Sequence, residues 1–457
     1  MNMNNLYLYD SPIITTPYKT SLKLIFADDT ASGRPCKLID KIIQDDILPY
    51  YSNTHSNAYC GMKMKEHITE SRDIIRKLYN LTPEHKIIFT GNGATGAINH
   101  LANSLDYKIY KQVYIYISIF EHYSNHLPWL EMAKIYDNIQ IKLIPINIDT
   151  DWLKNQLLET TSCDNMNIVS ITGCSNVSGV ITDLQSIINI MNIASKKIQD
   201  HHNFLFVDCA CLAPHRIFDC SKLDAVFISM HKFLGGTSSS GILIAKKSLF
   251  GKGSPYNPGG GCVRKIENNE IIYENDIEER EEGGTPNIVG IIRIKYVLQL
   301  HEKNYSDMIK LENELIKYIN SKITLLKNKY SNFILVVPSN NIDKVPIVSF
   351  IIKNLHFNFV VVLLNDLFGI QSRGGISCCG LLGEYMKQID INYDGWCRIT
   401  FNWLMPHDSV DYILKAIEFV IKFGHLFISH YNKSGNIFRH NQKNIYNIPN
   451  EKLFRLL

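Results

Sequence analysis

Short apolar runs alternate with stretches of helical periodicity between about residues 85 and 250, and this alternation constrains the fold more than any other feature. Six runs have the length of a buried strand. They are residues 86–90 (KIIFT), 113–119 (VYIYISI), 168–172 (IVSIT), 204–207 (FLFV), 225–229 (AVFIS) and 241–245 (GILIA). Strands that alternate with helices predict an α/β fold whose largely parallel sheet is covered on both faces. In such sheets ligands bind at the carboxyl ends of the strands, so candidate site residues are sought there.

One helix between these runs is predicted in detail. Residues 184–194 place their apolar side chains on a single helical face, namely Leu184, Ile187, Ile188 and Met191. Thr182 and Gln185 have the spacing of a capping box, which favours a helix start at this point.

The pattern changes after about residue 300. A long helix over 291–325 is expected to lead into strands at 333–337 and 348–352, and an amphipathic helix covers 410–421. The apolar run 359–364 has the length of a strand and is far too short to span a bilayer. We therefore expect an N-terminal segment (1–50) packed with a small α+β domain (301–430), a large domain (51–300) and a loosely attached polar tail (431–457).

Charge and cysteine content exclude several classes of function. A net charge of +3 over 457 residues predicts no strong attraction to nucleic acid or to a membrane. The polar start of the chain has no apolar signal-peptide core. Eleven cysteines follow no repeating spacing, so we expect free thiols, a reducing cytoplasmic compartment and no zinc site.

Three polar motifs stand at or after predicted strand ends. The turn 90–99 (TGNGATGAIN) offers backbone N–H groups at a helix start, which suits a phosphate, although glycine-rich turns also occur for tight geometry alone. Asp208 ends one strand and could equally cap a helix. Lys232 follows another strand; it is either a solvated edge residue or a partly desolvated, nucleophilic amine.

Together, the order of these motifs resembles class V aminotransferases, pyridoxal-phosphate (PLP) enzymes of the cysteine desulfurase and selenocysteine lyase group. The likeness runs from about residue 28 to 423 and implies PLP fold type I, with a large domain holding a mostly parallel sheet and a smaller C-terminal domain. By this resemblance Lys232 is the Schiff-base lysine, Asp208 pairs with the pyridine nitrogen, and His122 in EHYSNHLPW stacks on the ring. The resemblance also implies the remaining cofactor contacts: Gly93, Ala94, Thr95, Asn176, Ser229, His231 and Thr285.

Further residues are implied for the substrate and for a second subunit. Arg398 matches the arginine that binds the substrate carboxylate, and Asn53 and His55 match a stretch near the substrate. Thr285, in EEGGTPN, matches a residue that reaches the phosphate of the neighbouring subunit, which implies a homodimer with shared sites.

The reaction type depends on residues 371–380 (QSRGGISCCG). Cys378 aligns with the cysteine that takes sulfur from substrate in desulfurases, although it and Cys379 could also be small fillers of a glycine-rich loop. Two departures are visible: Cys211 stands where desulfurases carry a glutamine near the PLP phenolic oxygen, and Ala94 replaces a hydroxyl residue of the phosphate cradle.

The expected function is cysteine desulfurase-like: L-cysteine becomes L-alanine while sulfur passes to the enzyme as a persulfide, with a possible sulfur-acceptor protein as partner. A class V aminotransferase or lyase acting on another small amino acid would keep Lys232, Asp208 and Arg398 without needing Cys378. A non-catalytic protein with the PLP fold is the third alternative.

Overall fold

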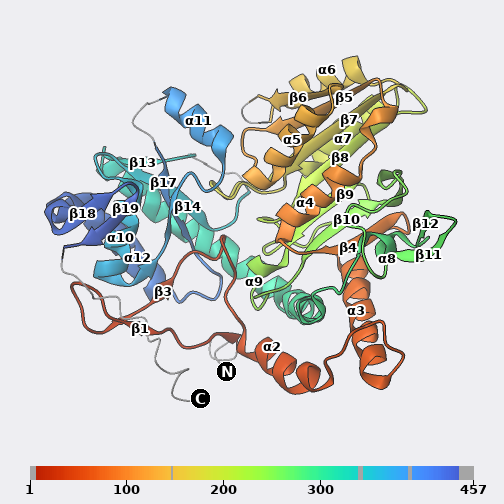
Figure 1. Ribbon diagram of the computed structural model, residues 1–457. Helices are drawn as coiled ribbons and strands as arrows, with labels where there is room; N and C mark the ends of the chain where they lie inside the picture. The colour runs from red at the N-terminus through yellow and green to blue at the C-terminus, as the bar shows by residue number, and fades with distance from the viewer. Residues whose placement is uncertain (1–6, 146–147, 338–342, 390–393, 442–457) are drawn as a thin grey trace.

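A seven-stranded sheet forms the centre of the larger part of the molecule (Figure 1). The computed structural model describes residues 7–145, 148–337, 343–389 and 394–441. In spatial order the strands are β4 (His85–Thr90), β10 (Gly241–Lys246), β9 (Ala225–Ser229), β8 (His202–Asp208), β7 (Asn165–Thr172), β5 (Gln112–Ser118) and β6 (Ile139–Ile144). Only β10 pairs antiparallel with its neighbours, so the other strands of this sheet share one direction. The largely parallel sheet expected from the sequence is confirmed.

Helices cover both faces of this sheet, because its strands are apolar on both sides. Leu205 and Val207 of β8 belong to a cluster with one layer of helices, whereas Phe206 between them belongs to a cluster with the other layer. The first layer contains α3 (Tyr59–Leu78), α6 (Thr150–Thr160), α7 (Leu184–Ser195) and the first half of α9 (Ile288–Lys329). The second layer contains α4 (Gly93–Ser104) and α5 (Leu127–Ile135).

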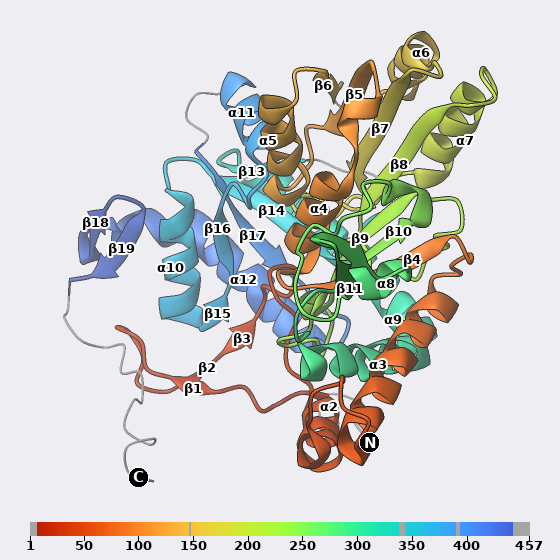
Figure 2. The same cartoon turned by 45° about the vertical axis from the view of Figure 1, so that its right-hand side comes forward.

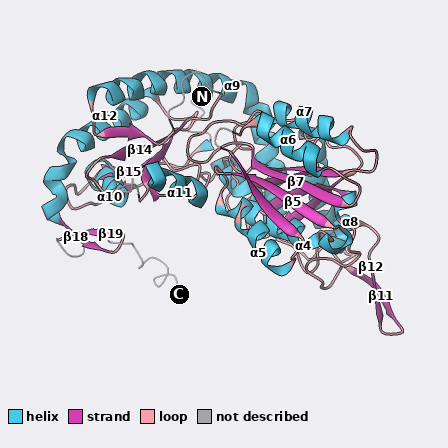
Figure 3. Cartoon of the chain, turned by 90° about the horizontal axis from the view of Figure 1, so that it is seen from above, coloured by secondary structure: helices cyan, strands magenta, loops and turns pink. Residues whose placement is uncertain are grey.

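A smaller part is built on a four-stranded antiparallel sheet (Figure 2). Its strands are β13 (Phe333–Leu335), β14 (Ile347–Ile352), β17 (Trp396–Thr400) and β16 (Arg373–Gly375). Helices α10 (Phe357–Phe368), α12 (His407–Phe423) and the second half of α9 pack into one cluster with it, and α11 (Gly380–Ile389) packs into another. The 42-residue α9 therefore contributes to the cores of both parts, and Figure 3 shows it running from one to the other.

The N-terminal segment joins the two parts. Strands β1 (Ile13–Ile14) and β2 (Leu22–Lys23) form a small ribbon, and β3 (Ile25–Phe26) pairs in parallel with β15 (Ile370–Gln371) of the smaller part. Helix α2 (Lys37–Ile42) follows and contacts α9. The intervening residues 28–32 thus cross the space between the two sheets.

Two hairpins project from the body. Strands β11 (Val263–Glu267) and β12 (Glu270–Tyr273) extend beyond the larger part, before the short helix α8 (Ile277–Glu281) (Figure 3). Strands β18 (Tyr431–Ser434) and β19 (Ile437–His440) lie on the smaller part. Tyr431 is buried there and donates a hydrogen bond to Asp366 Oδ2 at 2.8 Å, so residues 431–441 are not a loose extension as expected. Residues 442–457 of the expected tail lie outside the described residues.

One local expectation is wrong, and several elements were not predicted. The apolar run 359–364 has the length of a strand but lies in helix α10, since a short buried apolar run is compatible with either structure. Helix α7 is capped by Asp183, whose side chain accepts from Ser186 N at 3.1 Å. Thr182 instead donates to the carbonyl of Thr172 at 2.6 Å, so no Thr182/Gln185 capping box forms. Of the strands described in the two main sheets, β6, β16 and β17 were not predicted from the sequence.

Candidate active site

A cavity of about 160 Å³ opens at the carboxyl ends of the parallel strands, facing the smaller part. Strands β7, β8 and β9 end beside it at Thr172, Asp208 and Ser229, all three of which line it. The cavity brings together nine of the residues predicted from the sequence: Ala94, Thr95, His122, Asn176, Asp208, Ser229, His231, Lys232 and Arg398. The sheet topology explains this convergence, since residues far apart in sequence end their strands at one edge.

Lys232 provides a nucleophilic amine at the wall of this cavity. It ends the one-turn helix Met230–Lys232, which directly follows β9. Withdrawal from solvent lowers its pKa, while the negative charges of Cys211 and Asp208 act in the opposite direction. A lysine with a lowered pKa is more often present as the free amine, the form that attacks a carbonyl group.

Asp208, at the end of β8, and His122, four residues after the end of β5, both line the cavity. Burial raises the pKa of Asp208, and the carboxylate accepts a hydrogen bond from Ala210 N at 2.9 Å. Burial and the nearby charges of Lys232, Arg398 and Arg373 lower the pKa of His122 to about 4. His122 is therefore a neutral ring at physiological pH, and its Nδ1 lies 2.9 Å from Ser124 Oγ.

The N-terminus of α4 forms the polar end of the cavity. Ala94 N donates to Ser229 Oγ at 2.9 Å, and Thr95 Oγ1 lies 2.6 Å from Ser124 Oγ. Gly93 has φ +59°, and a Cβ there would lie 2.7 Å from Ser229 Oγ and 2.9 Å from His231 Cε1. Only glycine fits this approach, which leaves hydroxyl, imidazole and N–H groups gathered at a helix N-terminus, an arrangement that suits a phosphate.

Arg398 closes the side of the cavity that belongs to the smaller part. It is 2% exposed, and its guanidinium donates to Asp28 Oδ1 at 3.0 Å and to the carbonyl of Asn176 at 3.1 Å. The other oxygen of Asp28 lies 3.4 Å from Nε of Arg373, which is half exposed. Asp28 thus holds two arginines at the cavity, where they can bind a carboxylate.

The two vicinal cysteines differ in environment. Cys378 is exposed and does not line the cavity, but the preceding residue, Ser377, does. The backbone carbonyl of Cys378 accepts from Tyr123 N at 2.7 Å, and its φ is +54°. Cys379 is buried, which raises its pKa to about 12, so it is the poorer nucleophile of the pair.

Asn53, His55 and Thr285 lie together, but not in this cavity. All three are exposed, and Asn53 Nδ2 donates to Thr285 Oγ1 at 3.1 Å. His55 N donates to Asn53 Oδ1 at 2.9 Å. They form an exposed polar cluster on the larger part of the same chain.

Several residues of the site were not singled out from the sequence. Asp28, Cys174, Ser124 and Ser377 either line the cavity or hold a residue that does. Asp28 comes two residues after the end of strand β3. A polar residue just after an apolar strand was the signal in the sequence that could have indicated it. Ser377 carried no signal, because it enters the cavity only through the fold of the glycine-rich loop.

Comparison with known proteins extends these observations to the whole chain. The class V aminotransferase family model (Aminotransferase class-V) matches residues 25–413. The chain belongs to this family, whose members are PLP-dependent enzymes. It is 30% identical to a cysteine desulfurase of Wigglesworthia glossinidia brevipalpis over 91% of this chain and 96% of the relative. It is 29% identical to a probable cysteine desulfurase of Borreliella burgdorferi over 90% of this chain and 95% of the relative.

A solved structure shares the fold. The apo cysteine desulfurase of Thermococcus onnurineus NA1 aligns with a TM-score of 0.75 at 23% identity, covering 87% of this chain and 95% of that one. The expected PLP fold type I is confirmed. Among the residues that the structure describes, no helix is both long and apolar enough to cross a membrane.

The cavity fits the cofactor of the family. Gly93 lets the start of α4 approach Ser229 and His231, where a side chain at residue 93 would clash, and these groups would hold the phosphate. Asp208 offers a carboxylate for a protonated ring nitrogen, and Lys232 offers the amine. At the other end of the cavity, Arg398 Nε is buried without a hydrogen-bond partner and can donate to a ligand.

Proposed function

We propose that this protein is a PLP-dependent enzyme that removes sulfur from L-cysteine, with Lys232 as the residue that holds the cofactor. The observation that carries the proposal is the meeting of Lys232, Asp208, His122 and the α4 N-terminus in one cavity that also contains Arg398. The relatives named cysteine desulfurase supply the substrate and the reaction. When bound, PLP supplies an electron sink that makes the bonds at the substrate α-carbon labile.

Each residue of the chain has a role in this proposal. Ser229, His231, Thr95 and backbone N–H groups after Gly93 hold the phosphate. The carboxylate of Asp208 pairs with the protonated ring nitrogen, and the neutral His122 ring packs on the cofactor without adding positive charge. The asparagine that matches Asn176 in class V relatives lies near the ring hydroxyl of the cofactor. In this chain the Asn176 amide donates to the carbonyl of Ser377 at 2.8 Å, which connects the two walls of the cavity.

Arg398 and Lys232 act on the substrate. Arg398 binds the substrate carboxylate, and Asp28 keeps the guanidinium in place. Lys232 moves the proton of the substrate α-carbon, which its lowered pKa favours. The small cavity between the two sheets excludes most bulk water from these groups.

Cys378 receives the sulfur in this proposal. Its thiolate attacks the substrate sulfur, the carbon–sulfur bond breaks, and a persulfide forms on Cys378 while the three-carbon remainder takes up a proton and leaves as alanine. The thiol follows Ser377 at the cavity wall and is exposed, so it can approach substrate and then present its sulfur to an acceptor protein. A reducing compartment such as the cytoplasm keeps the Cys378 thiol free to attack the substrate in each turnover.

A second subunit completes the site in this proposal. The cluster of Asn53, His55 and Thr285 is exposed and lies outside the cavity of its own chain. In a homodimer this cluster contacts the cavity of the partner subunit.

The experiment is an absorption spectrum of the purified protein, followed by addition of L-cysteine with a reductant and assays for sulfide and alanine. A visible band from bound PLP that is lost in Lys232→Ala supports the cofactor assignment. Equal amounts of sulfide and alanine, lost in Cys378→Ala and kept in Cys163→Ala, support desulfurase chemistry. Cys163 is also an exposed, free cysteine and is the matched control.

A second candidate is an aminotransferase or lyase that acts on another small amino acid. The absence of Cys378 from the cavity lining favours it, because such an enzyme needs only Lys232, Asp208 and Arg398. A PLP band without sulfide, and turnover of an amino acid that survives Cys378→Ala, would decide for this alternative. A protein without any PLP band would be a non-catalytic relative.

A further inference from the structure

Two buried thiols, Cys174 and Cys211, lie side by side in the wall of the active-site cavity. Cys174 comes two residues after β7 and Cys211 three residues after β8, and these parallel strands are paired at their ends through Thr172 and Asp208. The adjacent strand ends therefore bring the two cysteines together. None of the proposed catalytic steps uses either thiol.

The Cys174 and Cys211 side chains influence each other. Cys174 Sγ donates to the carbonyl of Gly179 at 3.3 Å. The interaction with Cys174, together with the positive charges of Lys232, His215 and Arg398, lowers the pKa of Cys211 to about 7 although burial acts against it. Burial raises the pKa of Cys174. Cys211 is thus partly ionised to the thiolate at neutral pH, and Cys174 remains a thiol beside it.

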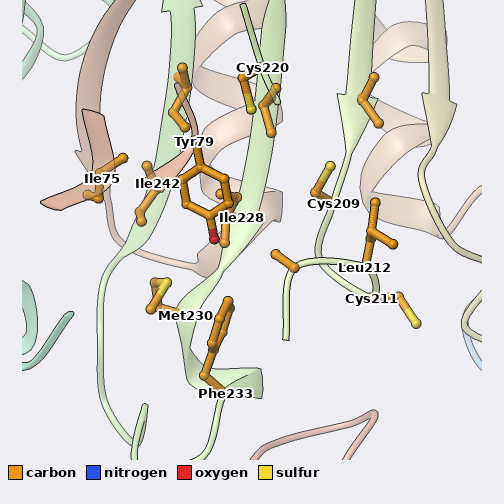
Figure 4. Close-up of a cluster of buried hydrophobic side chains, with 14 of the residues drawn as sticks. Ile75, Tyr79, Cys209, Cys211, Leu212, Cys220, Ile228, Met230, Phe233 and Ile242 are labelled. Atoms are coloured by element: carbon orange, nitrogen blue, oxygen red, sulfur yellow. The ribbon is translucent and has the colours of Figure 1, made fainter. Parts of the chain in front are cut away.

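Two neighbouring cysteines, Cys209 and Cys220, have neither a lowered pKa nor a position in the cavity wall. Cys209 and Cys220 are fully buried in the apolar cluster under the sheet, and burial raises the pKa of each well above the usual value. Figure 4 shows that the side chains of Cys209 and Cys211 leave one loop in different directions. Neither Cys209 nor Cys220 lines the cavity. Because reactivity follows thiolate character and access, Cys211 is the cysteine of this region that a small oxidant reaches and attacks.

We propose that Cys211 and Cys174 are a redox modification site that closes to a reversible disulfide when a peroxide enters the cavity. The Cys211 thiolate attacks one peroxide oxygen, the O–O bond breaks, and with one proton the products are a sulfenic acid and water. The Cys174 thiol then attacks the sulfenic sulfur, and the S–S bond forms as a second water leaves. The peroxide is reduced and both thiols are oxidised, so atoms and electrons balance; an external dithiol reverses the reaction.

The bond would tie together the loops that follow β7 and β8. It would also remove the negative charge of Cys211 from beside Lys232, a charge that raises the pKa of this lysine. The effect on the cofactor rests on the proposed function, but formation of the bond does not.

The test is peptide mapping of the full-length protein after treatment with hydrogen peroxide and capping of free thiols with N-ethylmaleimide. The expected result is a peptide pair joined through Cys174 and Cys211, released by dithiothreitol, in the wild type and in the matched control Cys209→Ser. The pair is absent from Cys174→Ser and Cys211→Ser, and in Cys174→Ser a dimedone adduct marks Cys211.

Capping of Cys174 and Cys211 as separate thiols after peroxide treatment would overturn the proposal, as would a disulfide that joins Cys211 to a cysteine other than Cys174. The readout is a covalent bond between two cysteines, and detecting it depends neither on bound cofactor nor on substrate. Its failure therefore leaves the desulfurase proposal standing, and a missing PLP band would leave this proposal standing.

Discussion

Asp28 shows how one buried residue supports a binding site that it does not itself form. Asp28 is 7% exposed, and its carboxylate contacts both Arg398 and Arg373. Replacing it with alanine leaves the buried Arg398 guanidinium without its charge partner. Removing one member of a buried ion pair costs about 3–5 kcal/mol, so Asp28→Ala is expected to lower the free energy of unfolding by about that amount. Urea denaturation at neutral pH measures it.

The control for this prediction is Asp10→Ala. Asp10 also faces a cation, Lys37, at 3.9 Å, but its side chain is fully exposed. Its replacement is expected to leave the unfolding midpoint unchanged, because exposed ion pairs contribute little. Equal midpoints for the two variants would show that Asp28 is not a structural partner of Arg398.

At the scale of single elements, the N-terminus of α4 depends on glycine at residue 93. Gly93→Ala places a side chain against Ser229 and His231 at a left-handed backbone position, which costs about 1–2 kcal/mol by itself. PLP affinity is expected to fall by about tenfold, equivalent to about 1.4 kcal/mol, because the phosphate cradle must open. Fluorescence titration of the apoprotein with PLP measures this change.

Gly91→Ala is the matched control two residues earlier. A Cβ there meets nothing within 4 Å, so PLP affinity should stay at the wild-type value. If both alanine variants bind PLP equally well, the α4 N-terminus is not the phosphate site.

Helix α9 carries a histidine that makes stability depend on pH. His301 packs against Phe233, its Nε2 is buried without a partner, and burial lowers its pKa to about 4. In the unfolded chain a histidine titrates near 6.5, so between these values the unfolded state binds the proton that the folded state does not. Its contribution to stability is therefore present above pH 6.5 and is lost as the pH falls toward 4.

The variant His301→Leu tests this dependence. From pH 7 to pH 5 the wild type is expected to lose about 1–2 kcal/mol through this residue, and the leucine variant should lose that much less. Urea denaturation at the two pH values measures the difference. His425→Leu, at an exposed histidine just after α12, should keep the wild-type loss. If His301→Leu loses as much unfolding free energy from pH 7 to pH 5 as the wild type, His301 is not the source of this pH dependence.

The elements also show what the sequence could and could not predict. Strands β4, β5 and β7–β10 were predicted because strands buried on both faces are continuous apolar runs, and their polar ends marked Asp208 and Lys232. Helix α10 was not, since the run 359–364 has no polar face to reveal a helical period. Asp28 and Cys174 enter the site through tertiary packing, which a pattern along one segment does not contain.

At the scale of the whole molecule, the position of Asn53, His55 and Thr285 bears on how many chains make one active site. These residues are exposed and absent from the cavity that holds Lys232 in the same chain. In a twofold dimer each chain can lend this cluster to its partner. Mixed dimers of Lys232→Ala with a His55→Ala/Thr285→Ala chain then contain one intact site, because the intact Lys232 of one chain meets the intact cluster of the other.

Unfolding and refolding the two inactive variants together is expected to restore about a quarter of the wild-type sites, by random pairing in a twofold dimer. Sulfide production measures the recovery, and each variant refolded alone is the control. A site built within one chain gives no recovery, because every mixed dimer then has one site without Lys232 and one without the cluster. Recovery would make the dimer, rather than the chain, the catalytic unit, and would explain why three predicted site residues lie outside the cavity of their own chain.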